Sequence, residues 1–257
     1  MEYTKFFYEK KGGIIIVTFN NPEKLNALTK EFLEEFSFFL DKIEQDEEVQ
    51  VVILTGAGKA FVAGADISLM QCMTPEEAAM YSKNTTDVYA KMEGMRKIFI
   101  AAINGFALGG GCEFTLACDL RIASTRAKFG LPEASLGIFP GGGGTQRLPR
   151  LIGMAKAKEL VYTTRIITAD MAEKIGLVNE VVQADELLNR AQNLAAEILK
   201  NSNSAIRLSK EAFNQGAQMD IISAINLEKN LFALCFATDE QKEGMAAFTE
   251  KRTPNFK

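Results

Sequence analysis

The stretch Ile98–Glu113 reads IFIAAINGFALGGGCE and indicates how the first part of the chain folds. Its first half, Ile98–Asn104, is a short apolar run of the kind that forms a buried strand. Its second half is rich in glycine and leads into a short helix predicted at Cys112–Cys118. Glycines let the backbone approach a ligand closely, and a helix N-terminus adds partial positive charge. The stretch therefore predicts a strand–turn–helix unit that either holds an oxyanion or a phosphate, or only makes a tight turn.

Other glycine-rich segments narrow the possible ligands. Gly109–Gly111 does not complete the G-x-G-x-x-G pattern of a dinucleotide site, and Gly141–Gly144 lacks the Lys-Ser/Thr of a P-loop. The segment Ala60–Ile67 also follows an apolar strand, predicted at Val51–Thr55, and is able to supply a second backbone N–H donor. The glycine-rich segments thus match neither a dinucleotide-binding site nor a P-loop.

Two glutamates stand in glycine-rich settings, Glu113 after Gly109–Gly111 and Glu133 in the segment Phe129–Glu133. One interpretation is that each is a solvated surface charge, since most glutamates lie at the surface. The alternative is a pair in one dry pocket, where two carboxylates do not both ionise easily and tend to hold one proton between them. Because the chain has no histidine, proton transfer near neutral pH falls to carboxylates, Lys, Tyr, Cys or water. The pair therefore indicates acid/base chemistry on an activated carbonyl compound.

Length, composition and charge exclude several classes of protein. The chain has 257 residues, 47% of them hydrophobic and 24% charged, which is ordinary for a soluble globular protein. A net charge of −4 and a pI of about 5.2 argue against nucleic acid as the partner. The N-terminus lacks the layout of a signal peptide, and the apolar runs Ile14–Val17 and Ile98–Ile103 are shorter than the roughly 20 residues that span a bilayer. We therefore expect a cytoplasmic protein with no membrane partner.

The four cysteines, Cys72, Cys112, Cys118 and Cys235, form no C-x-x-C pair. Without histidine there is no Cys/His zinc pattern either, so no metal site is expected. We interpret the cysteines as free, mostly buried thiols in a reducing compartment. A nucleophilic role for Cys112, which neighbours Glu113, is the minor alternative.

The pattern of apolar residues alternates strands and helices over the first two-thirds of the chain and is helical afterwards. Strands are predicted at Ile14–Asn20, Val51–Thr55, Ile98–Asn104 and Leu120–Ser124, and helices from Thr29, at Pro75–Arg96 with Thr74 as N-cap, and near 185–200, 203–216, 220–234 and 239–251. The last two helices carry more apolar surface than a lone appendage should expose. Part of that surface is expected to pack against another subunit.

Taken together, the motifs resemble the crotonase family, also called the enoyl-CoA hydratase/isomerase family. The resemblance covers nearly the whole chain in the family's order. Its motifs are Asn26–Leu28, Phe61–Ile67, Ala101–Glu113, Cys118-Asp119, Phe129–Glu133, Gly137–Leu148, Gly176–Val178 and Glu250–Arg252. Within the family, the chain looks most like the short-chain hydratases and the 3-hydroxybutyryl-CoA dehydratases.

The resemblance implies an α/β fold, a spiral of repeated ββα units with a C-terminal helical region that builds trimers. We expect residues 1–195 to form the spiral core with the thioester site and residues 196–257 to form the oligomerisation region. A homotrimer, or a homohexamer made as a dimer of trimers, is implied.

The resemblance also implies a coenzyme A thioester substrate and a role for each site residue. The backbone N–H groups of Ala65 and Gly110 would form the oxyanion hole, and Glu113 and Glu133 would be the catalytic carboxylates. The remaining residues implied to bind substrate are Lys24, Ala63, Asp66 and Ile67 at the CoA moiety, Gly141 at the reacting water, and Lys251 of a neighbouring subunit at the CoA phosphates. No cofactor is expected, since CoA is part of the substrate.

The implied reaction is reversible hydration of a short-chain 2-enoyl-CoA, as in crotonyl-CoA to 3-hydroxybutyryl-CoA. The alternatives are an enoyl-CoA isomerase of the same family, which needs only the carboxylate that matches Glu133, and a non-catalytic protein that holds CoA. Two positions depart from the common pattern: Ile98 replaces a proline, and Leu131 replaces a glutamine of close hydratases. Leucine cannot orient a carboxylate or water as an amide does, so Leu131 is expected to bear on rate or reaction type.

Overall fold

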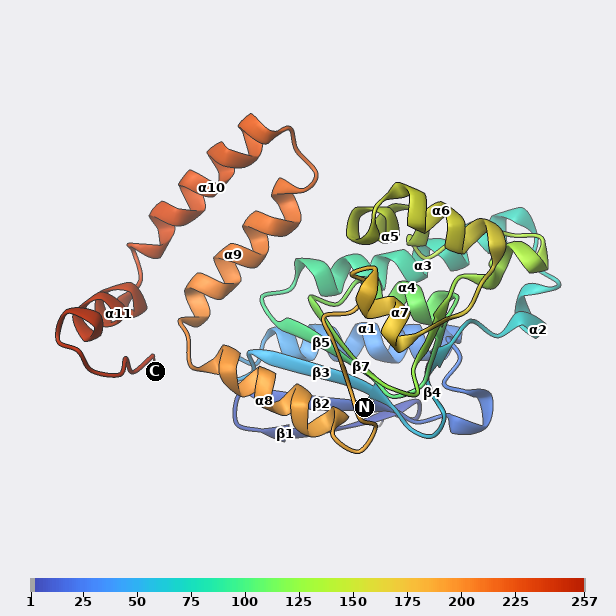
Figure 1. Ribbon diagram of the computed structural model, residues 1–257, viewed down its shortest axis with the longest axis horizontal. Helices are drawn as coiled ribbons and strands as arrows, with labels where there is room; N and C mark the ends of the chain where they lie inside the picture. The colour runs from blue at the N-terminus through green and yellow to red at the C-terminus, as the bar shows by residue number, and fades with distance from the viewer. Residues whose placement is uncertain (1–2, 257) are drawn as a thin grey trace.

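The computed structural model describes residues 3–256, which form two β-sheets wrapped by helices and a helical arm on one side (Figure 1). The larger sheet has the strand order β1 (Phe6–Lys11), β2 (Ile14–Phe19), β3 (Val51–Gly56), β5 (Ile98–Ile103), β7 (Leu120–Ser124) and β10 (Glu180–Val182). The smaller sheet has the order β4 (Ala60–Ala63), β6 (Phe106–Leu108), β8 (Lys128–Gly130) and β9 (Ile167–Thr168). Outer strands β1 and β9 pair antiparallel, and all other pairs are parallel.

Consecutive strands divide between the two sheets in a repeated manner. β3, β5 and β7 each enter the larger sheet, and the strand that follows each of them, β4, β6 or β8, enters the smaller sheet. A turn or helix then returns the chain to the next repeat. This is the ββα repetition that the resemblance implies.

The helices of the core begin where the sequence places their caps. Thr29 caps α1 (Lys30–Glu44), and Thr74 with Glu77 forms a capping box at the start of α3 (Pro75–Gly94). The remaining helices of the core are α2 (Ile67–Met70), α4 (Gly110–Leu116), α5 (Gly144–Ile152), α6 (Met154–Thr163), α7 (Ala169–Lys174) and α8 (Leu187–Leu199), with single 3₁₀ turns at Pro22–Lys24 and Pro132–Leu136. The predicted start of α4 at Cys112 is wrong by two residues, because Gly109 occupies the N-cap position.

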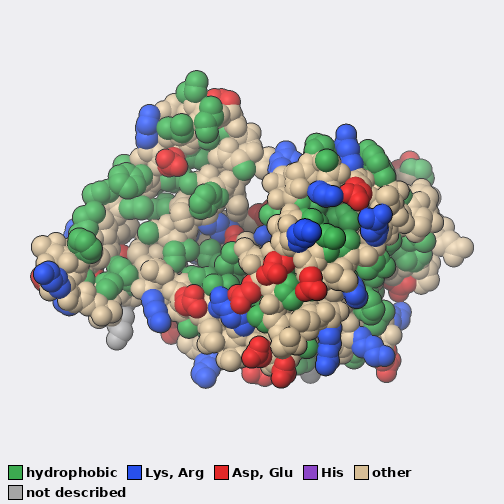
Figure 2. Space-filling view, viewed as in Figure 1, with side chains coloured by type: hydrophobic (Ala, Val, Ile, Leu, Met, Phe, Trp, Pro, Cys, Tyr) green, Lys and Arg blue, Asp and Glu red, His purple; other side chains and the backbone are tan. Residues whose placement is uncertain are grey.

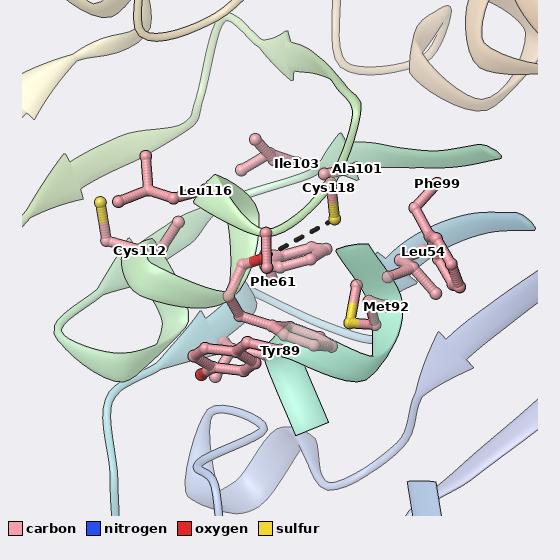
Figure 3. Packing of buried hydrophobic residues seen from close by; sticks show 14 of the residues in the cluster. Leu54, Phe61, Tyr89, Met92, Phe99, Ala101, Ile103, Cys112, Leu116 and Cys118 are labelled. Carbon is pink, nitrogen blue, oxygen red and sulfur yellow. Dashed lines mark hydrogen bonds between the residues drawn. The ribbon is translucent and has the colours of Figure 1, made fainter. Parts of the chain in front are cut away.

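Alternate residues of the central strands face opposite sides of the larger sheet, which gives the protein two apolar layers. Leu54 and Phe99 face the main core, where Figure 3 shows them beside Phe61, Tyr89 and Met92. Ile53 and its neighbours on the other face pack against α8 through Leu187, Ala191 and Ala195. The central strands are therefore buried on both faces, as their continuous apolar sequence predicts.

Helix α8 runs through residue 195, so the boundary expected at 195/196 falls inside a helix that packs on the sheet. Three helices follow it: α9 (Asn203–Gly216), α10 (Ile221–Cys235) and α11 (Asp239–Thr249). They form the arm that extends from the core in Figure 1. Lys210 joins α9 to the core, since its buried ammonium group contacts Asp119 at 2.9 Å and the carbonyl oxygens of Met92 and Lys97 at 3.1 and 2.7 Å.

The arm exposes large apolar side chains, and Figure 2 shows them spread over its surface. The most exposed are Phe213, Ile221, Ile222, Phe232 and Phe248. Among residues 3–256 no single helix has the length and hydropathy to cross a membrane; α10 and α11 reach both only as a pair, which bends by 76° between them.

Candidate active site

One cavity of about 680 Å³ receives most of the residues singled out in the sequence. Its wall is made by the ends of β4 and β6, the start of α4, one face of α3, and the loop and turn that contain Pro132–Gly143. The predicted site residues that line it are Ala63, Ala65, Ile67, Gly110, Glu113, Glu133 and Gly141. The folded chain thus brings together motifs that are up to 78 residues apart in sequence, from Ala63 to Gly141 (141 − 63).

The two predicted N–H donors are placed by the register of two short parallel strands. Ala63 of β4 pairs with Leu108 of β6, and Ala65 and Gly110 each lie two residues beyond that pair. The residue between is a glycine in both strands, Gly64 with φ 78° and Gly109 with φ 53°. Only glycine adopts positive φ without strain, so each strand is followed by a glycine turn just before its donor. Neighbouring strands lie about 4.8 Å apart, which keeps the two donors close to each other.

Neither donor is occupied by the protein itself. Within residues 3–256, the N–H groups of Ala65 and Gly110 donate no hydrogen bond, while the flanking Leu28 N–H and Asp66 N–H bond to the Gly64 and Leu28 carbonyls at 2.9 and 3.4 Å. Gly110 is the first residue of α4, where backbone N–H groups lack intrahelical acceptors. Both groups are therefore available to an oxygen atom in the cavity.

Glu113 is 3% exposed and lies on α4 one turn after Gly110. Its Oε1 accepts hydrogen bonds from the N–H groups of Gly142 and Gly144 at 2.8 and 2.7 Å. Burial raises the pKa of Glu113 above its ordinary value, while these N–H donors and the charge of Arg147 act in the opposite direction. The glycine loop thus holds a buried carboxylate in a fixed orientation.

Glu133 lies in the 3₁₀ turn Pro132–Leu136 and has a different environment. Its Oε2 is buried and has no hydrogen-bond partner among the described residues. Burial, with a smaller contribution from the charge of Glu113, raises the pKa of Glu133 to about 7. A Cβ atom added at Gly109 would lie 3.1 Å from Glu133 Oε1, so the carboxyl group also contacts the turn that precedes the Gly110 donor.

Contacts that the sequence did not predict support this loop and the Gly110 peptide. Arg147 on α5 donates to the Gly142 carbonyl at 3.0 Å and binds Glu93 through two nitrogens at 2.6 and 2.7 Å. Tyr89 on α3 donates its hydroxyl hydrogen to the Gly110 carbonyl at 2.8 Å. Arg147 follows the glycine loop in the sequence, but nothing in the sequence indicates which carbonyl it reaches.

The remaining predicted residues are placed outside the cavity lining. Lys24 contacts Asp66 at 3.3 Å, and Asp66 also caps α2 by accepting from the Ser68 N–H. Asp66 belongs to the Ala63–Ile67 segment, and its contact with Lys24 places that lysine beside the segment. Lys251 follows α11 in the arm and is not among the residues that line the cavity of its own chain.

The departures at Leu131 and Ile98 are absorbed by the apolar core. Leu131 is 1% exposed, packs in the main core, and is not among the cavity-lining residues. Ile98 begins β5 and donates its N–H to the Gln50 carbonyl at 2.9 Å, a hydrogen bond that a proline lacks. Its side chain joins the apolar layer against α8.

The described cysteines are free, and two of the four are buried. Burial raises the pKa of Cys112 to about 12, which disfavours the thiolate form that a nucleophile requires. No group of three or more His, Cys, Asp or Glu side chains that could hold a metal ion occurs within residues 3–256.

Comparison with known proteins places this geometry in context. The sequence model of the family "Enoyl-CoA hydratase/isomerase" matches residues 9–257. The chain is 50% identical to the short-chain-enoyl-CoA hydratase of Clostridium acetobutylicum, over 98% of this chain and 97% of that protein. It is 49% identical to the crotonyl-CoA hydratase of Syntrophomonas wolfei, over 100% and 99% of the two chains. The crystal structure of an enoyl-CoA hydratase from Bacillus anthracis superimposes with a TM-score of 0.95 at 41% identity, covering 99% of each chain.

Proposed function

The chain belongs to the enoyl-CoA hydratase/isomerase family, and from that membership we propose that it adds water reversibly to short-chain 2-enoyl-CoA thioesters with Glu113 and Glu133 as its acid/base pair. It is a hydro-lyase that interconverts 2-enoyl-CoA and 3-hydroxyacyl-CoA, with crotonyl-CoA as the reference substrate. The observation that carries the proposed site is one cavity that holds both carboxylates beside two backbone N–H groups without an internal acceptor.

The N–H groups of Ala65 and Gly110 bind the thioester oxygen. Water addition across the conjugated double bond builds negative charge on that oxygen, and fixed donors stabilise the charge without reorganising. Loss of one donor in comparable oxyanion holes costs about 2.7–4 kcal/mol of transition-state stabilisation. The strand register of β4 and β6 supports this role because it places the donors before substrate arrives.

Glu113 takes a proton from the water that attacks C3, and Glu133 delivers a proton to C2. In dehydration, Glu133 removes the C2 proton and Glu113 protonates the leaving hydroxyl group. In both directions the pair carries one proton in total. Hydration starts with that proton on Glu133, and dehydration starts with it on Glu113. The raised pKa of Glu133, about 7, supports a carboxyl group that carries this proton near neutral pH. The N–H of Gly141 helps to hold the reacting water.

The backbone of Ala63–Ile67 and the Lys24–Asp66 pair bind the CoA moiety at the mouth of the cavity. Their location beside β4 supports this assignment. Lys251 of a neighbouring subunit reaches the CoA phosphates. The reaction needs no cofactor other than the CoA that the substrate carries, and we expect it to take place in the cytoplasm.

The arm α9–α11 forms the subunit interface of a homotrimer or of a homohexamer built from two trimers. Its exposed apolar side chains support this assignment, since water-exposed patches of this kind mark interfaces. Light scattering of Phe232→Asp, with Lys158→Asp at an exposed position of the core helix α6 as control, tests it. Dissociation of the Phe232 variant alone is expected, and an intact oligomer in that variant would move the interface elsewhere.

The principal alternative is a double-bond isomerase of the same family. Isomerisation moves one proton between two carbons and needs one carboxylate, which Glu133 supplies. The second carboxylate, Glu113, is held by two N–H donors and has no task in that reaction. Its retention in the cavity favours hydration, as it also does over a protein that merely binds CoA.

Absorbance of the conjugated thioester measures the proposed function directly. Purified protein is mixed with crotonyl-CoA, in parallel with Glu113→Gln and Glu133→Gln, which keep the shape of each side chain. We expect rapid loss of absorbance with the wild type and a decrease of about 100- to 10,000-fold in kcat for each variant. Turnover at the wild-type rate in both variants would reject Glu113 and Glu133 as the acid/base pair. Absence of crotonyl-CoA turnover in the wild type would reject the assignment as a short-chain hydratase.

A further inference from the structure

A second cavity lies on the other side of helices α2 and α3 from the active-site cavity. Its volume is about 780 Å³, compared with about 680 Å³ for the active-site cavity. The apolar residues that line it are Leu33, Leu69, Met73, Met80 and Val88. Within the described chain, Tyr81 is the one residue that lines both cavities.

The two faces of α3 explain this arrangement. Ala78, Ser82 and Thr85 line the active-site cavity, whereas Met80 and Val88 line the second cavity. Residues three and four apart share one face of a helix, so these sets form opposite faces. Tyr81 lies where the faces meet and lines both cavities.

The hydroxyl group of Tyr81 is not anchored to another element of the fold by a hydrogen bond within residues 3–256. It is buried and has no hydrogen-bond partner among residues 3–256, although a buried hydroxyl without a partner is unfavourable. Thr85, one helical turn further along α3, donates its hydroxyl hydrogen to the Tyr81 carbonyl at 3.0 Å. The ring, rather than the hydroxyl group, is therefore the part of Tyr81 whose position has a structural consequence.

The position of Tyr81 corresponds to the far end of a bound acyl chain. The thioester oxygen lies at Ala65 and Gly110, and C3 faces Glu113. Tyr81 and Glu113 line the same cavity, and Ser82, the neighbour of Tyr81 on α3, donates to the Gly141 carbonyl at 2.6 Å, next to the loop that holds Glu113. Carbons beyond C3 continue past Glu113 towards α3, where the ring of Tyr81 meets them.

We propose that the ring of Tyr81 closes the acyl end of the active-site cavity and restricts the enzyme to short 2-enoyl thioesters, an inference that rests on the proposed function. Behind the ring lies the second cavity, where Leu33, Met80 and Val88 offer apolar surface to further methylene groups, beside charged side chains such as Glu34 and Asp87. Removal of the ring connects the two cavities and admits longer chains. Each methylene that leaves water favours binding by about fourfold, which is about 0.8 kcal/mol.

The test compares kcat/KM for 2-octenoyl-CoA with kcat/KM for crotonyl-CoA in four proteins. These are the wild type, Tyr81→Ala, Tyr81→Phe, which keeps the ring, and Met80→Ala, which enlarges only the second cavity. We expect the octenoyl/crotonyl ratio to rise by about tenfold or more in Tyr81→Ala and to stay near the wild-type value in the other two variants. Tyr81→Leu, which shortens the side chain but keeps it apolar, should shift the ratio in the same direction if Tyr81→Ala does not fold.

Three results would overturn the inference while leaving the hydratase intact. They are an unchanged ratio in a folded Tyr81→Ala that still hydrates crotonyl-CoA, an equal shift in Tyr81→Phe, and an equal shift in Met80→Ala. Calorimetric binding of saturated octanoyl-CoA separates the inference from the proposed function. If the wild type turns over no enoyl-CoA, tighter octanoyl-CoA binding by Tyr81→Ala than by wild type still supports the ring as the barrier, and equal binding rejects it.

Discussion

Glu113 and Glu133 share one cavity but differ in their hydrogen bonds: Glu113 Oε1 accepts two backbone N–H groups, and Glu133 Oε2 accepts none from residues 3–256. Donors stabilise the ionised form of a carboxyl group, and burial without donors stabilises the protonated form. The asymmetry assigns the ionised state in the free enzyme to Glu113 and the proton to Glu133. That is the state from which the proposed hydration mechanism starts.

The pH dependence of kcat/KM should reflect the single proton on this pair. Hydration and dehydration start from two arrangements of the same proton, so both directions should show the same profile. Because the pKa of Glu133 is raised to about 7, kcat/KM should fall as pH rises above about 7, where the pair loses that proton. This pH dependence is measured as kcat/KM for crotonyl-CoA and for 3-hydroxybutyryl-CoA between pH 5.5 and pH 9. A profile that stays flat to pH 9 would contradict the assignment of the proton to Glu133.

Glu133→Gln should make the protein more stable at alkaline pH while removing activity. The folded state raises the pKa of Glu133 from 4.5 to about 7, so ionising this group costs folding free energy. That cost is absent below the unfolded pKa, grows as pH rises from 4.5 to 7, and is constant above. With allowance for solvent screening of a partly exposed group, it is on the order of 1–2 kcal/mol.

Urea unfolding at pH 8 and at pH 4.5, at one protein concentration, measures this difference. The variant should exceed the wild type in free energy of unfolding at pH 8 and match it at pH 4.5. Glu9→Gln, which removes one exposed negative charge from β1, is the control. An equal effect of Glu133→Gln at both pH values would show that the gain does not come from ionisation.

Gly142→Ala should inactivate the enzyme without unfolding it. A Cβ atom at this position would lie 2.6 Å from Glu113 Oε2 and 3.1 Å from the Tyr89 ring, so the carboxylate must move. A misplaced catalytic group commonly costs about 100-fold in rate. Kinetics with crotonyl-CoA measure the effect, and Gly94→Ala, whose Cβ would meet nothing within 4 Å, is the matched control. Near-wild-type kcat in Gly142→Ala would mean that the position of Glu113 is not critical.

Arg147→Gln should lower kcat by about tenfold and shift the acidic limb of the pH profile upwards. Arg147 holds the Gly142 carbonyl, and its charge lowers the pKa of Glu113, so its loss favours the protonated form of that base. Arg147→Lys keeps the positive charge but loses the planar guanidinium group. The acidic limb of its pH profile should therefore stay close to that of the wild type, while its kcat should decrease. Arg150→Gln, which removes a more exposed arginine of the same helix, is the control. If Arg147→Gln lowers kcat but leaves the acidic limb of the pH profile unchanged, Arg147 has a structural role only.

The sequence predicted the long elements and the residues of the cavity, because both depend on local signals. The strands at Val51 and Ile98 are continuous apolar runs, and α3 begins at a capping box. The site residues were predicted from the resemblance, whose motifs preserve spacing around glycines. The smaller sheet was not predicted, since strands of two to four residues such as β9 and β4 are shorter than any periodic pattern.

The sequence also did not predict the long-range polar contacts. Arg147 reaches Gly142 and Glu93 only after α3 and α5 are packed. The burial of Leu131 in the core was equally hidden, and its expected effect on rate or reaction type stays a prediction. Periodicity indicates which face is buried, but not which polar atoms meet. The role of Tyr81 likewise depends on two cavities that exist only in the folded chain.

The pairing of Ala63 with Leu108 has a consequence for transferring this site to another scaffold. Both N–H donors belong to the backbone, so their spacing depends on where two strands stop, not on which side chains follow. A designer would therefore copy three features: a parallel pair in this register, a left-handed glycine after each strand, and a next residue left without an acceptor. A deletion of one residue in either strand would separate the donors by about 3.3 Å along the sheet, even if every side chain of the cavity were kept.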